Sequence, residues 1–141
     1  MSNETLIPTE PSTLAVYSRR VDLVEVRRKP EAFPRIADTP RDQAIKKMVA
    51  LVYAAFLYRG QEIVPEKVKF IATALVDEIL ADPHFGLATL SWVEIGMVIR
   101  RAVLGGAKDL YGVSVASLYA ALVDYAKTEG HDAERRATQS H

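Results

Sequence analysis

The stretch SWVEIGMVIRRAVLGGAKDLYGVS, residues 91–114, decides the fold of this 141-residue chain. Ser91 and Glu94 have the S-x-x-E spacing in which the serine caps a backbone N–H and the glutamate bonds back, so a helix is predicted to begin here. The helix is apolar on nearly every side, which is typical of a helix surrounded by others. Only Glu94 and the pair Arg100 and Arg101 are left to face water.

The other helices follow from apolar residues that recur at three- and four-residue spacing. Pro40 and Pro65 suit the first position of a helix, and Ser114 suits a cap. The connections are short, so consecutive helices should pack against each other. We therefore predict an all-α fold, a compact bundle of four main helices over about 40–59, 65–81, 91–104 and 115–128.

The two ends of the chain differ from this bundle. Residues 1–12 are polar and carry two prolines, which predicts a flexible lead-in. Residues 13–28 fit either a helix or a short strand, and we favour a helix because the neighbours are helical. A single helical domain should then span residues 13–128. Residues 129–141 have no apolar periodicity, so we expect a flexible C-terminal tail.

Composition excludes several classes of protein. The chain has no cysteine, which excludes disulfides, thiolate zinc sites and a cysteine nucleophile. Lys and Arg number 18, as do Asp and Glu, so no net charge draws the chain to nucleic acid or to an anionic membrane. The sequence shows no leader and no apolar run near the roughly 20 residues that span a bilayer. We expect a cytoplasmic protein without membrane contact.

Catalytic signatures are missing from the sequence. His84, His131 and His141 lie in a loop and in the tail, without the spacing of metal ligands. The sequence contains no nucleophile elbow and no phosphate-binding loop with its strand. We therefore predict that the protein is not an enzyme and that it uses no cofactor and no metal.

The glycine-rich loop that follows the apolar helix, LGGAKDLYGVS, is the most unusual local feature. Its glycines suit a tight corner between two helices, and such a corner often serves packing alone. The alternative is an exposed polar ridge that binds another protein. The candidate residues of that ridge are Arg100, Arg101, Lys108, Asp109 and Tyr111.

A nucleic-acid site is the second alternative. Residues 17–35 hold six basic side chains against three acidic ones, the most positive part of the chain. The candidate residues are Arg19, Arg20, Arg27, Arg28 and Lys29. A helix-turn-helix is not expected, because the third helix is too apolar for a DNA groove and the fourth begins without base-reading side chains.

Several aromatic residues stand outside the main apolar stripes, and 49% of the chain is hydrophobic. They are Tyr17, Tyr53, Tyr58 and Tyr125. An exposed apolar patch and a homodimer are therefore part of the prediction.

The run from about Arg41 to Tyr125, with its L-S-x-x-E-I-x-x-V-I-R-R-A-x-x-G element and Y-G-V-S turn, resembles uncharacterised small all-helical proteins of bacteriophages, prophages and mobile elements. The resemblance implies a replication-accessory protein, similar to helicase-loading or replisome-organising proteins. The leading prediction is thus a non-enzymatic protein-binding adaptor that serves phage or mobile-element DNA replication. A nucleic-acid-binding module and a structural or assembly protein remain the alternatives.

Overall fold

The computed structural model describes residues 21–104 and 112–139, and these form an all-α fold. The helices are α2 (Leu23–Arg28), α3 (Arg41–Arg59), α4 (Pro65–Ala81), α5 (Trp92–Leu104), α6 (Val115–Tyr125) and α7 (His131–Gln139). Short 3₁₀ turns lie at Ile36–Asp38 and Leu87–Thr89, and a π-helical turn, Ala126–Gly130, joins α6 to α7. The four predicted main helices are confirmed. Of the segment left open between helix and strand, residues 23–28 are helical, and residues 13–20 lie outside the described parts, as does the lead-in 1–12.

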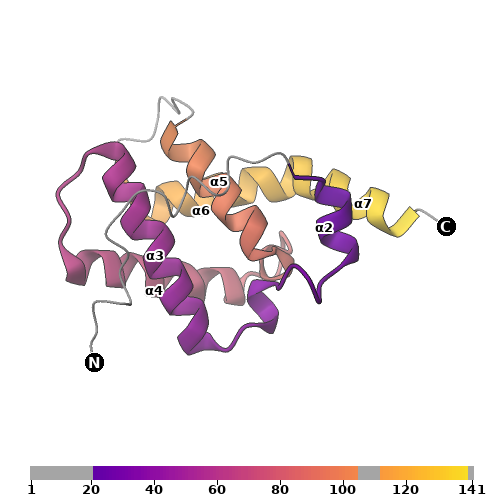
Figure 1. The fold of residues 1–141 in the computed structure, drawn as a ribbon, viewed down its shortest axis with the longest axis horizontal. Coiled ribbons are helices and arrows are strands. Elements are labelled where there is room, and N and C mark those ends of the chain that lie inside the picture. The colour runs from indigo at the N-terminus through magenta and orange to yellow at the C-terminus, as the bar shows by residue number, and fades with distance from the viewer. Residues whose placement is uncertain (1–20, 105–111, 140–141) are drawn as a thin grey trace.

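Four helices enclose the core. α3 packs on α4 and α5, and α6 packs on the same two helices, so that each of the four has two neighbours (Figure 1). Burial of each large apolar side chain contributes about 1.5–3 kcal/mol to stability, which is why these helices hold together. The largest fully buried side chains on them are Met48, Phe56, Leu75, Ile79, Ile95, Ile99, Leu118 and Leu122.

The start of α5 is held by the segment that precedes α3. The backbone N–H of Ile36 donates to the carbonyl of Leu90 at 2.9 Å, and the N–H of Trp92 donates to the carbonyl of Pro34 at 3.0 Å. The side chain of Ile36 is fully buried. This short pairing brings the connector after α2 against the first turn of α5.

The predicted flexible tail is wrong for the part that the structure describes. α6 ends at Tyr125 instead of residue 128, and residues 131–139 form α7, which lies beside α2 although the two are far apart in sequence (Figure 1). Asp132 pairs with Arg135 at 2.7 Å and with Arg136 at 3.2 Å, so α7 carries ion pairs one turn apart. Only Ala133 of this helix is buried, which is why apolar periodicity did not reveal it.

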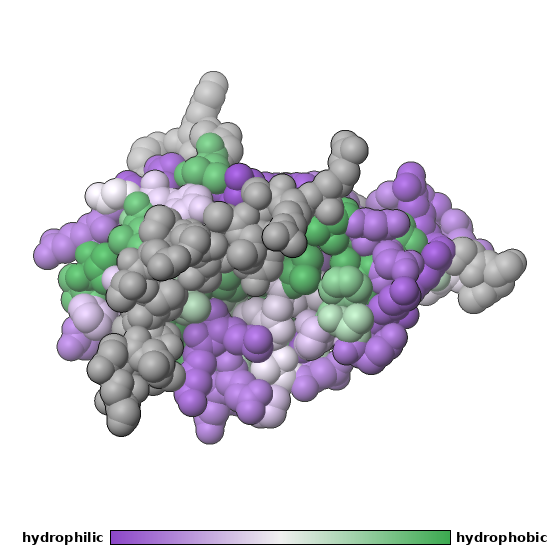
Figure 2. Space-filling model, viewed as in Figure 1, coloured by the Kyte–Doolittle hydropathy of each residue, from purple (hydrophilic) through white to green (hydrophobic). Residues whose placement is uncertain are grey.

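The surface carries dispersed apolar residues. Figure 2 shows several green hydrophobic patches beside purple and pale residues on the face drawn there. The large hydrophobic side chains exposed among the described residues are Val64, Phe70, Leu80, Phe85 and Leu104. No helix within the described ranges has the length and apolar character needed to cross a bilayer.

The predicted aromatic patch is wrong for the three tyrosines that the structure describes. Tyr125 is buried, and Tyr53 and Tyr58 are partly buried and pack against the core. Tyr17 lies outside the described residues. The homodimer therefore stays a prediction without this support.

Candidate functional site

The capping box at the start of α5 is confirmed, but its glutamate is not exposed. The backbone N–H of Glu94 donates to Ser91 Oγ at 3.1 Å, and Glu94 Oε1 accepts from both the N–H and the hydroxyl of Ser91, each at 3.0 Å. The prediction that Glu94 faces water is wrong, because its side chain is 0% exposed. A charged carboxylate in such a place needs partners for its second oxygen.

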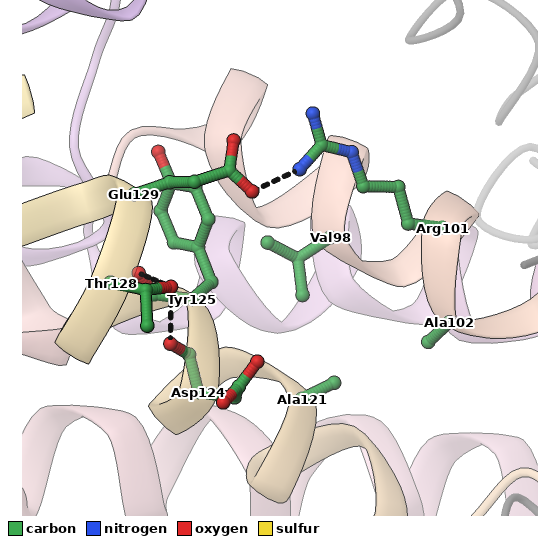
Figure 3. A pocket seen from close by; sticks show the side chains of 8 residues that line it. All are labelled: Val98, Arg101, Ala102, Ala121, Asp124, Tyr125, Thr128 and Glu129. Carbon is green, nitrogen blue, oxygen red and sulfur yellow. Dashed lines mark hydrogen bonds and ion pairs between the residues drawn. The ribbon is translucent and has the colours of Figure 1, made fainter. Parts of the chain in front are cut away.

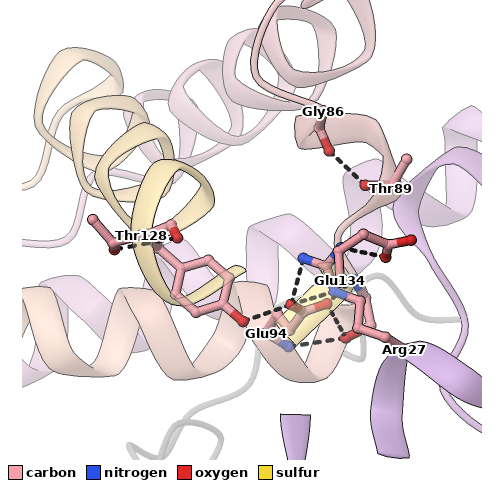
Figure 4. A network of polar contacts seen from close by, with 8 residues as sticks. Arg27, Gly86, Thr89, Glu94, Thr128 and Glu134 are labelled. Atoms are coloured by element: carbon pink, nitrogen blue, oxygen red, sulfur yellow. Dashed lines mark hydrogen bonds and ion pairs between the residues drawn. The ribbon is translucent and has the colours of Figure 1, made fainter. Parts of the chain in front are cut away.

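Those partners come from two distant helices. Glu94 Oε2 accepts from Arg27 Nε at 2.9 Å and lies 2.8 Å from Arg27 Nη2. Two nitrogens of the guanidinium therefore contact the same carboxylate oxygen (Figure 4). The hydroxyl of Tyr125, at the end of α6, donates to the same oxygen at 2.5 Å. A buried carboxylate thus joins α2, α5 and α6.

Arg27 is positioned by the short helix that carries it. Asp22 caps α2 by accepting from the N–H groups of Val24 and Glu25. The Arg27 side chain is only 6% exposed, and its Nη1 donates to Glu134 Oε1 on α7 at 3.1 Å. The same guanidinium therefore holds both Glu94 and the C-terminal helix (Figure 4). We call Arg27, Ser91, Glu94, Tyr125 and Glu134 the Glu94 network.

Gly130, the last residue of the π-helical turn, makes room for this network. A Cβ atom at this position would lie 3.0 Å from Tyr125 Cε2 and 3.1 Å from Arg27 Nη2. Both distances are shorter than ordinary van der Waals contact. The absence of a side chain at residue 130 therefore lets the turn pass close to the arginine and the tyrosine without displacing them.

Charge and burial define what the network can do. Burial works to lower the pKa of Arg27, but the Glu94 carboxylate outweighs it and the pKa of Arg27 is raised. Burial, followed by the negative charge of Glu94, raises the pKa of Tyr125 far above its ordinary value. Each oxygen of Glu94 accepts two hydrogen bonds, which fills the roughly four lone-pair positions of a carboxylate. A carboxylate so occupied suits a structural role rather than proton transfer.

A hollow of about 220 Å³ opens between α5 and α6, on the other side of the Tyr125 ring (Figure 3). Small side chains at Ala102 and Ala121 leave this space between the two helices. We call it the α5–α6 hollow. Its lining residues are Val98, Arg101, Ala102, Ala121, Asp124, Tyr125, Thr128 and Glu129.

One exposed ion pair crosses the rim of the α5–α6 hollow. Arg101 Nη1 lies 2.7 Å from Glu129 Oε2, and the two side chains are 50% and 52% exposed (Figure 3). Leu104, one turn after Arg101 on α5, is 49% exposed. The hollow thus combines apolar groups from both helices with a solvated charge pair, and the exposed Leu104 lies one turn from that pair on α5.

The predicted partner-binding residues have different environments. Arg101 lies on the rim of the hollow. Arg100 is partly buried, and its Nε has no hydrogen-bond partner among the described residues. Lys108, Asp109 and Tyr111 lie outside the described residues.

The predicted nucleic-acid residues that the structure describes, Arg27, Arg28 and Lys29, do not form one free basic surface. Arg27 is buried in the Glu94 network and is not free for a phosphate, which corrects its assignment. Lys29 is exposed but pairs with Glu25 at 2.7 Å, and Arg28 is exposed beside it. Arg19 and Arg20 lie outside the described residues.

Sequence reasoning missed the residues that complete the Glu94 network. Arg27 and Tyr125 are 67 and 31 residues away from Glu94, so no local pattern links them. Tyr125 did stand outside the apolar stripes, and this was the one available signal. The part of the chain that the structure describes also holds no group of three or more His, Asp or Glu side chains suited to a metal ion.

Comparison of the chain with family models, with curated proteins and with solved structures finds no match.

Proposed function

We propose that this chain is a non-enzymatic protein-binding adaptor and that a partner protein docks on the α5–α6 hollow. The observation that carries the proposal is a depression of mixed polar and apolar lining whose rim bears the half-exposed pair of Arg101 and Glu129. Interface anchors are typically single side chains that fill such a depression, with arginine among the commonest contributors.

The energetics of the rim support docking. An exposed ion pair contributes only about 0–1 kcal/mol, so a partner can replace Glu129 on Arg101 at little cost. The exposed apolar surface of Leu104 would be removed from water in the same event, at about 25 cal/mol per Å². The exchange of the ion-pair partner and the burial of Leu104 both favour a partner that brings an apolar side chain and a carboxylate.

The Glu94 network supports a non-enzymatic role. Glu94 and Arg27 are the buried charged pair beside the hollow, yet each is occupied by the other and by fixed neighbours. Tyr125 reaches the hollow with its ring, while its hydroxyl is turned to Glu94. The charged groups that remain at the hollow are exposed rim residues, and these suit recognition.

The class of partner comes from the resemblance of residues 41–125 to phage and mobile-element proteins. On that basis the partner is a component of a DNA replication assembly, which the adaptor would bring to its site of action. The support is the sequence pattern alone, and the docking surface does not depend on it.

The test is crosslinking and capture in the native host. A photo-crosslinking amino acid replaces Ala102 in the hollow, and the captured protein is identified by mass spectrometry. We expect capture to be lost when Arg101→Glu and Leu104→Glu are combined, and when Ala121→Leu fills the hollow without changing charge. The matched control combines Lys67→Glu with Leu80→Glu on α4, the same chemical changes away from the hollow.

Recovery of the same partner from all of these variants would contradict the docking surface. A mobility assay with single- and double-stranded DNA at two salt concentrations tests the nucleic-acid alternative. Salt-sensitive binding by the isolated protein would replace the adaptor with a nucleic-acid-binding module.

A further inference from the structure

A second depression lies between α3 and α4, on a different helix pair from the α5–α6 hollow. Its volume is about 610 Å³, within the ~300–1,000 Å³ typical of binding pockets. Ile45 and Val49 of α3 and Pro65 of α4 form its apolar part. We call this depression the α3–α4 groove.

Two lysines flank the groove without ion-pair partners. Lys46 on α3 and Lys69 on α4 both line it, and within the described residues neither ammonium has an ion pair. Each lysine has an acidic residue about one turn earlier on its own helix, Asp42 before Lys46 and Glu66 before Lys69. Neither acid forms an ion pair with its lysine. Both acids stand in the first turns of their helices, where the helix dipole stabilises a negative charge. The lysines are therefore the charges that remain available to a ligand.

An exposed aromatic residue lies beside the groove. Phe70 follows Lys69 on α4 and is 68% exposed, the most exposed of the large hydrophobic side chains among the described residues. It sits on the outer face of α4, away from the buried stripe that includes Val68, Ile71 and Leu75. Its ring is therefore an apolar surface that a bound molecule could cover.

The order of charges argues against a second copy of this chain in the groove. α3 and α4 are antiparallel, since Arg41 near the start of α3 pairs with Asp77 near the end of α4. Along the groove the charges therefore run acid, lysine, lysine, acid. A copy related by a two-fold axis at the centre would place lysine against lysine. The acids at the two ends also oppose a polyanion such as nucleic acid.

We propose that the α3–α4 groove binds an amphipathic helix of a partner protein that carries apolar anchors and a central acidic side chain. The lining of α3 runs from Asp42 to Val49, which is about two helical turns or ~10 Å. Apolar side chains one turn apart would occupy the floor beside Phe70, and a carboxylate between them would meet Lys46 and Lys69. This inference goes beyond the proposed function, because it gives the chain a second docking surface that does not depend on the first.

The experiment uses the full chain and a synthetic peptide as probe. The peptide is a fluorescein-labelled amphipathic helix about three turns long, with leucines on one face and glutamates beside them. A matched peptide has lysine in place of each glutamate. Binding is measured by fluorescence anisotropy, and the site is located by ¹⁵N chemical-shift changes.

We expect the acidic peptide to bind, with shift changes around Val49 and Phe70. Combining Lys46→Glu with Lys69→Glu should weaken binding at least about tenfold, since two attractive rim contacts become repulsive. The control combines Lys47→Glu with Lys67→Glu, the same charge change on the same helices outside the groove, and should keep affinity within about twofold. Circular dichroism and thermal unfolding verify that both variants fold.

Three results would each overturn the inference. They are absence of binding, equal or tighter binding of the basic peptide, and shift changes confined to α5 and α6. Self-association of the free chain with shifts at Phe70 would assign the groove to a second copy and would likewise overturn it. If the crosslinker at Ala102 captures no partner while the peptide still binds, only the proposed docking at the α5–α6 hollow is contradicted.

Discussion

Two arginine–glutamate pairs of nearly equal length each have one residue on α5, and they differ in almost everything else. The N–O distance is 2.8 Å for Arg27 and Glu94 and 2.7 Å for Arg101 and Glu129. The first pair is 6% and 0% exposed, and the second is 50% and 52% exposed. Tyr125 lies between them, with its hydroxyl on the first pair and its ring on the hollow below the second.

The environment of an ion pair, more than its N–O distance, sets how much it contributes to stability. Removing one partner of a buried pair leaves an uncompensated charge and costs about 3–5 kcal/mol, whereas an exposed pair contributes about 0–1 kcal/mol. The first pair is therefore part of the fold. The second can exchange its partner, which is what a docking surface needs.

The largest expected effect is on the buried pair. Arg27→Met keeps an apolar stem of similar length but leaves Glu94 without its counter-charge, so the free energy of unfolding should fall by about 3–5 kcal/mol. Urea denaturation followed by circular dichroism measures it. Restoring stability by adding Glu94→Gln would confirm that the lost charge pairing is the cause. A change below about 1 kcal/mol would remove the distinction between the two pairs.

The next effect concerns the tyrosine shared by both regions. Tyr125→Phe removes one hydrogen bond to a charged acceptor and should lower the free energy of unfolding by about 1.5–3 kcal/mol. Tyr119→Phe is the matched control, because Tyr119 is partly buried and is not part of the Glu94 network. Equal effects of the two substitutions would show that the Tyr125 hydroxyl has no special role.

Gly130→Ala should lower the free energy of unfolding by about 1–3 kcal/mol, since the added methyl group overpacks the site of Arg27 and Tyr125. The neighbouring exposed substitution Glu129→Ala should cost no more than about 1 kcal/mol. In the Arg27→Ala background the cost of Gly130→Ala should shrink, because the guanidinium it meets is gone. If Gly130→Ala is equally destabilising in both backgrounds, the added methyl group does not clash with Arg27.

The free energy of unfolding should depend on pH in the alkaline range because of Tyr125. Its pKa is raised in the folded state, so the phenol is neutral in both states below its unfolded pKa of about 10. As the pH rises above about 10, the unfolded phenol ionises first and stability falls by up to about 1.4 kcal/mol per pH unit. Tyr125→Phe should make the alkaline part of the stability curve less steep. An identical alkaline slope in the wild type and the variant would contradict this.

The smallest expected effect is on the exposed pair. Arg101→Met should change the free energy of unfolding by less than about 1 kcal/mol. The same urea titration used for Arg27→Met provides the measurement and the direct contrast. A loss as large as that of Arg27→Met would mean that Arg101 is structural and would weaken its role in docking.

The main helices could be predicted from sequence because their signals are local. Apolar spacing, Pro65 at a first helical position and the pairing of Ser91 with Glu94 all act within one or two turns. The burial of Glu94 could not be predicted, since it depends on Arg27 and Tyr125, which the fold brings from other helices.

The C-terminal helix and the candidate hollow show two further limits. α7 is polar and is stabilised by its own charge pairs and by α2, so a search for apolar stripes overlooks it, although the spacing of Asp132, Arg135 and Arg136 was visible. Arg101 was identified as exposed from the helix pattern. The hollow beside it depends on Ala102 and Ala121 meeting across two helices, which one sequence does not reveal.

The contacts of Arg27 also set an order of events during synthesis. Its partners Glu94 and Glu134 lie 67 and 107 residues later in the chain. At about 5–20 residues per second, the ribosome needs roughly 5–20 s between making Arg27 and making Glu134. A six-residue helix such as α2 does not hold its shape alone in that interval. The residues of α2 are therefore synthesised long before the contacts that stabilise the helix can form. In a nascent chain stalled before residue 134, Arg27 would lack its ion pair with Glu134.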